Sequence, residues 1–166
     1  MTIQGRHSKE WNSVVAARDA YLEALRAIPY DELAEVLKCA LDDRESVPTA
    51  LSILATGAVG LVDEVAPALY RLLLSMSSPI HGARRAILRL PPDRLSAHLA
   101  ALVKRVIEDP ASDYEPYRCL EGLLLTAGEL GLLAALVAKA RESDDPDLLE
   151  FADDATTHLD RDGQRQ

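Results

Sequence analysis

The histidines are the first residues to consider for chemistry, because a neutral imidazole serves both as a general base and as a metal ligand. They are spread over separate segments and lack the spacing of a His-Glu-x-x-His zinc site. Two of them could approach each other across successive helices. Ordinary surface histidines nevertheless fit the pattern best for all four: His7, His81, His98 and His158. The sequence therefore predicts no metal site.

The cysteines and the closest pair of carboxylates are also weak candidates for catalysis. Cys39 and Cys119 lie in apolar segments, where a thiol usually behaves as a small hydrophobic group. We therefore expect both to be buried, and reduced because no dense cysteine framework is present. Asp153 and Asp154 occupy adjacent helical positions, whose side chains diverge by about 100°. Such a pair is poorly placed for general acid–base catalysis.

Nucleotide-binding motifs are missing as well. The glycines at 57–60 and 128–131 follow no strand, so a dinucleotide-binding turn is excluded, and no phosphate-binding loop occurs. Asp63 and Glu64 lie near the expected start of a helix, where carboxylates interact favourably with the helix dipole. The sequence thus predicts no catalytic residue, no cofactor and no enzymatic activity.

Composition favours helices throughout. The chain has 166 residues, 48% of them hydrophobic, with one Phe and one Trp, and its apolar residues are mostly Leu, Ala and Val. Helix formers dominate and the residues that favour strands are sparse. This length suits a single domain, which we expect to span 1–166.

The charge balance restricts the class of partner. The formal net charge is −9, from 18 basic and 27 acidic residues. Binding to nucleic acid or to an anionic membrane requires a basic surface, so both are disfavoured. A basic protein partner fits this charge, and so does solubility alone. With no secretory signal in residues 1–7 and no long apolar run, we expect a cytoplasmic, soluble protein.

Turn-forming residues divide the chain into nine expected helices. An N-terminal helical pair is expected over 8–42, with Ser8 as the first cap and with apolar stripes in both helices. The first stripe comprises Trp11, Val14, Tyr21, Leu25 and Ile28, and the second comprises Leu33, Val36, Leu37, Ala40 and Leu41. The residues of 161–166 are expected to form a frayed polar tail.

Between 45 and 160 the expected helices follow a period. Helices are expected to begin about 33 to 35 residues apart, and each of the first three is followed by a partner helix. These starts lie near Ser46, Pro79, Tyr114 and Asp147. Stacked helical hairpins produce such a period, and an irregular helical bundle is the alternative.

Three stretches resemble HEAT repeats: 62–73 resembles the second helix of a unit, while 77–86 and 144–155 resemble the junction between units. The resemblance covers 45–160. It implies an all-α, right-handed solenoid of about four HEAT-like helical hairpins, with eight to nine helices. It also implies a protein that binds other proteins along an extended groove.

Charge is unevenly distributed along the repeats. The segment 84–105 carries six basic residues against Asp93, while 142–162 carries nine acidic residues against Arg161. We expect residues of both segments to contact a partner, namely Arg84, Arg85, Arg89, Asp147, Glu150, Asp153 and Asp154. Alternatively, the acidic segment is only the polar cap that a solenoid needs at its end.

The function that fits these features best is a non-catalytic protein-binding module, in concrete form a bacterial immunity-type inhibitor of a basic toxin. An adaptor or regulatory subunit of a larger complex is the alternative. HEAT-like folds also include DNA-repair glycosylases and tetrapyrrole-handling proteins. A DNA enzyme fits less well, because the net charge is negative and Trp11 is the only tryptophan.

Overall fold

The structure, a computed structural model, describes residues 9–109 and 112–163, the last three of these by their backbone only. Within these residues the chain forms nine helices and no strand, so the all-α prediction is confirmed. Ser8, expected as the first cap, lies outside the described residues. The last helix continues to Gly163, so the expected tail belongs in part to a helix.

The chain divides into two compact units, Met1–Val36 and Leu37–Gln166. The division falls inside α2 (Tyr30–Asp42), and therefore inside the helical pair expected over 8–42. In the first unit, α1 (Lys9–Arg26) contains no buried residue, so its predicted apolar stripe is not a core face. The apolar stripe predicted for α2 is only partly buried, because Leu33 is buried but Val36 is exposed.

The second unit contains seven further helices that follow the predicted period. They are α3 (Val47–Thr56), α4 (Val59–Leu73), α5 (Ile80–Ile87), α6 (Pro92–Glu108), α7 (Tyr114–Ala127), α8 (Leu130–Ala140) and α9 (Pro146–Gly163). The odd-numbered helices from α3 onward begin about 33 residues apart, as expected for repeated hairpins.

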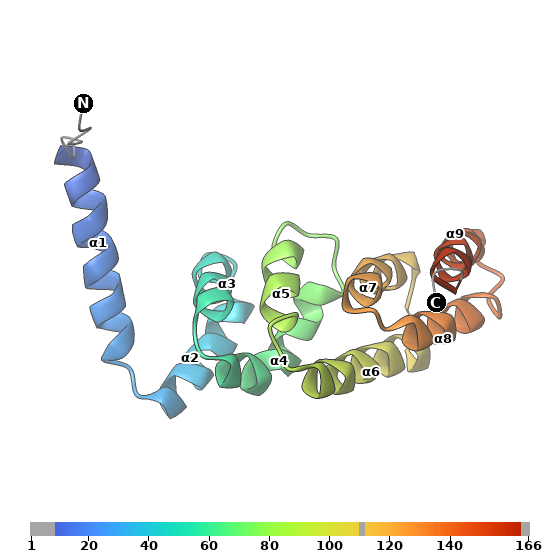
Figure 1. Cartoon of the computed structure of the whole chain (residues 1–166), viewed down its shortest axis with the longest axis horizontal. Helices are drawn as coiled ribbons and strands as arrows, with labels where there is room; N and C mark the ends of the chain where they lie inside the picture. Colours follow the sequence, from blue (N-terminus) through green and yellow to red (C-terminus); the bar gives the residue numbers. More distant parts are fainter. Residues whose placement is uncertain (1–8, 110–111, 164–166) are drawn as a thin grey trace. The chain divides into compact units, whose positions relative to one another are not determined.

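These helices stack in a solenoid-like arrangement. Each neighbouring pair from α3 to α9 except α5 and α6 shares substantial contacts, and α3 packs on α5, α6 on α8 and α7 on α9. Figure 1 shows α3, α5, α7 and α9 along one side of this unit, with α4, α6 and α8 along the other. The side chains between the two layers form the core.

The core consists of leucine-rich stripes at helical spacing. Among its fully buried members are Leu99 and Leu102 of α6, Leu133 and Leu136 of α8, and Phe151 of α9. Met76 follows Leu69 and Leu72 at the same spacing but is exposed. Since α4 ends at Leu73, the helical period does not continue to that residue.

Arginine side chains join successive repeats. The guanidinium of Arg89 donates to the carbonyl oxygens of Leu54 and Gly57, at the C-terminal end of α3. The guanidinium of Arg71 similarly donates to the carbonyl of Leu41 at 2.8 Å. Helix C-termini expose carbonyls without an intrahelical partner. These arginines satisfy such carbonyls and so help to fix one repeat on the next.

Two helices of the second unit have unusual local features. Ser46 precedes α3, but its hydroxyl donates to Asp43 and makes no cap bond to the helix. Pro67 lies well inside α4. Because proline has no N–H, the usual bond to the carbonyl of Asp63 is missing at that point.

Candidate partner-binding surface

The acidic residues predicted to bind a partner share the outer side of α9. Helix α9 turns Leu148, Phe151, Ala152 and Ala155 inward, where all four are buried. This three- and four-residue spacing leaves the other side of the helix to polar residues. The structure places there Asp147, Glu150, Asp153 and Asp154, all exposed, which we call the acidic face.

One residue of the acidic face is tied to the helix beside it. Arg118 of α7 donates through Nη2 to Asp154 at 2.6 Å and through Nη1 to Glu121 at 3.2 Å. Its Nε donates to the hydroxyl of Tyr114 at 2.8 Å, and its guanidinium lies 5.6 Å from the centre of the Phe151 ring. Only 17% of the Arg118 side chain is exposed. Because its guanidinium contacts residues of both helices, Arg118 is the central residue, or hub, of the contact between α7 and α9.

The protonation of Arg118 follows from these contacts. Burial disfavours the charged form and would lower the pKa of the guanidinium. The hydrogen bonds to Asp154, Glu121 and Tyr114 act in the opposite direction and outweigh burial, so the pKa lies above its usual value. Arg118 is therefore a permanent positive charge that binds two carboxylates of different helices.

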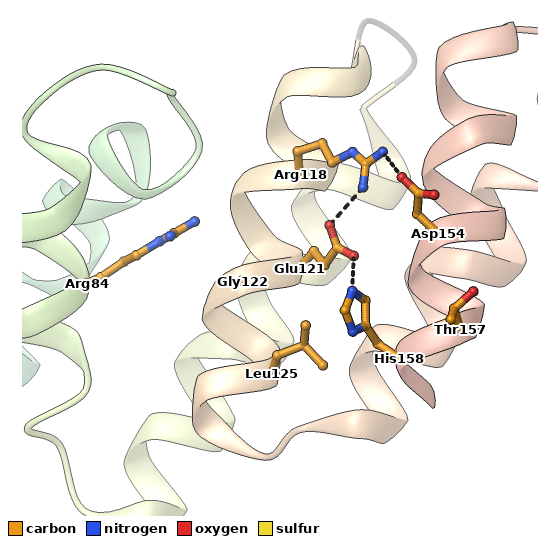
Figure 2. Close-up of a pocket in the computed structure, with 8 residues that line it drawn as sticks. All are labelled: Arg84, Arg118, Glu121, Gly122, Leu125, Asp154, Thr157 and His158. Carbon is orange, nitrogen blue, oxygen red and sulfur yellow. Dashed lines mark hydrogen bonds and ion pairs between the residues drawn. The ribbon is translucent and has the colours of Figure 1, made fainter. Parts of the chain in front are cut away.

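A cleft of about 510 Å³ opens beside this hub. Figure 2 shows the residues that line it, namely Arg84 of α5, Arg118, Glu121, Gly122 and Leu125 of α7, and Asp154, Thr157 and His158 of α9. Gly122 helps to create the hollow, because a Cβ there would lie 3.3 Å from Nη1 of Arg84. The guanidinium of Arg84 can therefore lie against α7, where its Nη2 donates to the carbonyl of Cys119 at 2.5 Å.

Two residues that line this cleft each have a buried polar atom without a hydrogen-bond partner within the described residues, namely Oε1 of Glu121 and Nε of Arg84. The side chain of Glu121 is buried, with the residue only 8% exposed, and no other charged residue is buried in the part of the chain that the structure describes. The imidazole Nε2 of His158 lies 4.0 Å from Oε1, which is too long for a hydrogen bond. Buried polar atoms are usually paired, so both atoms mark this cleft as unusual.

The predicted basic residues do not gather in one place. Arg84 lines the cleft, as Asp154 does from the opposite helix, so the structure brings these two predicted residues to one site. Arg85 is exposed on another face of α5, beside a cleft that includes Pro48. Arg89 uses its guanidinium within the chain, on the carbonyls at the end of α3.

The sequence did not point to Arg118 or Glu121 as site residues, and it indicated only an ordinary surface histidine at His158. The available signal was the i, i+3 spacing of Arg118 and Glu121, which places opposite charges side by side on a helix. Their position between the apolar residues Tyr117, Leu120 and Leu124 could have marked them as a buried pair.

A second polar cluster joins α4 to α6. The carboxylate of Asp63 accepts from Nε2 of His98 at 2.9 Å and from Nε of Arg94 at 3.1 Å. The hydroxyl of Tyr70 donates to Nδ1 of the same imidazole at 2.8 Å. Asp63 is thus an interhelical partner and lies beyond the first turn of α4, which corrects the expected helix-dipole role. Burial, and secondarily the charge of Asp63, raises the pKa of Tyr70.

Replacing Asp63 with asparagine is expected to lower the free energy of unfolding at neutral pH by about 1–2 kcal/mol, because charge-assisted hydrogen bonds are lost. The hydrogen bonds from Arg94 and His98 hold the pKa of this carboxyl below its usual range. A depressed pKa stabilises the fold above the unfolded-state pKa, and that stabilisation disappears as pH falls through the folded-state value. Urea unfolding of D63N and wild type should therefore differ at pH 7 and converge below about pH 4.

The matched control for this variant is Glu64→Gln, which removes the same charge from the exposed next residue. It should change stability little at either pH. Equal stability of D63N and wild type at pH 7 would contradict the role of the cluster in joining the two helices.

The two thiols differ in environment. Cys119 is buried, as expected, and burial raises the pKa of its thiol. Cys39 is exposed, which corrects the expectation that it is buried. It lies on the solvent side of α2, although its immediate neighbour Ala40 is partly covered.

Metal and membrane sites were also considered. Over 9–109 and 112–163, no cluster of three or more His, Cys, Asp or Glu residues could hold a metal ion. The described helices include none with the length and hydropathy to span a membrane.

Comparisons with protein-family models, curated proteins and solved structures found no match to this chain.

Proposed function

We propose that the protein is a non-catalytic binding module whose acidic face contacts a basic protein. The observation that carries this proposal is the outward display of Asp147, Glu150 and Asp153 on the last helix. No cation pairs with these three carboxylates among the side chains that the structure describes. Only Asp154, the fourth member, has such a partner. A surface of this sign attracts basic proteins and accelerates their association.

The arrangement of α9 supports binding in addition to solubility. A simple solubilising cap needs only scattered charge, whereas here three unpaired carboxylates stand on one side of a helix that Phe151 and Arg118 hold in place. Because the helix is already held in place, its carboxylates lose little backbone freedom when a partner binds. The proposal therefore treats the acidic face as a preformed docking site.

In its most concrete form, the module is an immunity-type inhibitor with a HEAT-like solenoid fold, which neutralises a basic toxin by covering its active surface. The net charge of −9 and the resemblance of 45–160 to HEAT repeats support this form. A bacterial cytoplasm is the compartment in which such an inhibitor acts, and we propose it for this chain.

The test begins with affinity capture from cells of the source organism and purification of the partner that is recovered. Replacing Asp147 and Asp153 with Asn and Glu150 with Gln should weaken its binding between about threefold and about a hundredfold, since each rim charge contributes about 0.2–1 kcal/mol. Titration calorimetry at several salt concentrations should show a flatter salt dependence for this variant than for wild type.

The matched control is the triple variant Glu45→Gln, Glu64→Gln and Asp93→Asn, which removes the same net charge from exposed positions elsewhere. It should bind almost as tightly as wild type. Equal loss in both triple variants would mean that net charge matters and the acidic face does not. Recovery of a stable multi-subunit complex that binds through Arg85 would favour the adaptor function instead.

A further inference from the structure

The cleft between α7 and α9 has a feature that the acidic face alone does not explain. Oε1 of Glu121 is a buried carboxylate oxygen that accepts no hydrogen bond within the described residues. The other oxygen, Oε2, accepts from Arg118. Leaving a buried acceptor unpaired is costly, so the arrangement suggests that a donor from outside completes it. Figure 2 shows Glu121 directed toward α9, between Arg118 and His158.

We propose that this cleft receives the guanidinium of one arginine side chain from the basic partner. The inference rests on the proposed function, since it assigns the anchoring contact of that same interface. The incoming guanidinium would donate to Oε1 of Glu121 and to the carboxylate of Asp154 at the mouth of the cleft. Leu125, half-buried on α7, offers an apolar wall for the methylene groups of the side chain.

The charges around the cleft favour a cation at its α9 end. Glu121 and Asp154 contribute two negative charges there, Arg118 contacts both of them, and the imidazole Nε2 of His158 lies 4.0 Å from Oε1 of Glu121. The unpaired carboxylates of the acidic face lie on the same helix and add to the negative potential. Arg84 lines the cleft from α5, where its guanidinium is bound to the carbonyl of Cys119. The two guanidiniums balance the two carboxylates of the cleft, so the acidic face supplies the attraction for a further cation, which is expected beside α9 and not beside the positive Arg84.

An arginine suits this geometry better than a compact ammonium group. The two acceptors belong to different helices, and the planar guanidinium presents five donors that can reach both at once. Asp154 is 54% exposed, so the mouth of the cleft is open to an incoming side chain, while Glu121 is nearly closed to water. Charge-assisted bonds to a carboxylate in such a place are strong.

The first experiment uses a defined probe, N-acetyl-arginine methylamide, with the citrulline analogue as its uncharged control. Titration of the whole chain is followed by the NMR signals of the His158 imidazole and of the α7 and α9 amides. The arginine probe should shift these signals in a saturable manner and the citrulline probe should not. Glu121→Gln should weaken binding of the arginine probe about tenfold or more. No saturable shift, equal shifts by both probes, or unchanged binding by E121Q would overturn the proposal.

A second pair of variants avoids altering the buried carboxylate. Thr157 is exposed on α9 and lines the cleft, so T157R should place a guanidinium of the chain itself at the site. T157Q adds a long side chain without the charge. We expect T157R to abolish the saturable shift and T157Q to retain it. Binding of the probe by T157R with wild-type affinity would contradict the proposal.

The captured partner separates this inference from the proposed function. If neutralising Asp147, Glu150 and Asp153 weakens partner binding while T157R does not, the acidic face is the interface and the cleft is not its anchor. If T157R weakens partner binding and the triple variant does not, the cleft carries the contact and the acidic face fails as proposed.

Discussion

Replacing Arg118 with methionine is expected to lower the free energy of unfolding by about 3–5 kcal/mol, because it leaves the carboxylate of Glu121 buried without a compensating charge. Arg118 has 17% and Glu121 11% of its side chain exposed, so water can replace the lost partner only in part. The same substitution removes the bonds to Asp154 and Tyr114. Urea unfolding followed by circular dichroism at pH 7 measures the change.

A double variant shows whether the lost charge is the cause. In R118M/E121L both members of the pair become apolar, and replacing a buried ion pair by hydrophobic residues is often neutral or stabilising. Most of the stability lost in R118M should therefore return. The control Arg18→Met removes an exposed arginine whose contact is to the adjacent Asp19, and it should have little effect. A similar loss in R118M and the double variant would show that packing, and not charge, dominates at this position.

The repeats of the second unit could be read from the sequence because local signals and tertiary packing agree there. Turn residues such as Pro79 and Pro146 coincide with real helix boundaries, and the leucine stripes between them are buried. In α1 the apolar stripe exists but is not buried. Periodicity predicts which side of a helix can pack against another element. It does not predict whether such an element is present.

The candidate site was only half predictable for a related reason. The acidic face follows from helical spacing along α9, since its residues lie opposite Leu148 and Phe151. The cleft depends on pairs 35 and 36 residues apart, Arg84 with the carbonyl of Cys119 and Arg118 with Asp154. Such pairs require the stacking of successive repeats to be known. Arg89 also makes contacts that the sequence does not reveal, because its guanidinium donates to carbonyls at the end of α3, 35 and 32 residues away.

The acidic face and the cleft both depend on how firmly α9 is held, and Phe151 holds it. This ring is fully buried and meets the ring of Tyr117 edge-on, with centroids 5.4 Å apart, while Arg118 lies over its face. Replacing Phe151 with alanine should lower the free energy of unfolding by about 3–5 kcal/mol, through lost burial and the cavity left behind. Urea unfolding measures the total change, and amide hydrogen exchange locates it.

The position of α9 determines where that loss should appear. Its main contacts are with α7 and α8, and in stacked repeats each unit is stabilised chiefly by its neighbours. Hydrogen exchange should therefore accelerate most in α7 to α9 and least in α3 to α5. Leu149→Ala is the matched control, because Leu149 lies on the same helix but is 40% exposed, and it should cost less than about 1 kcal/mol. Uniform acceleration over α3 to α9 would mean that the second unit unfolds as a whole, and the acidic face would then owe its rigidity to the entire stack.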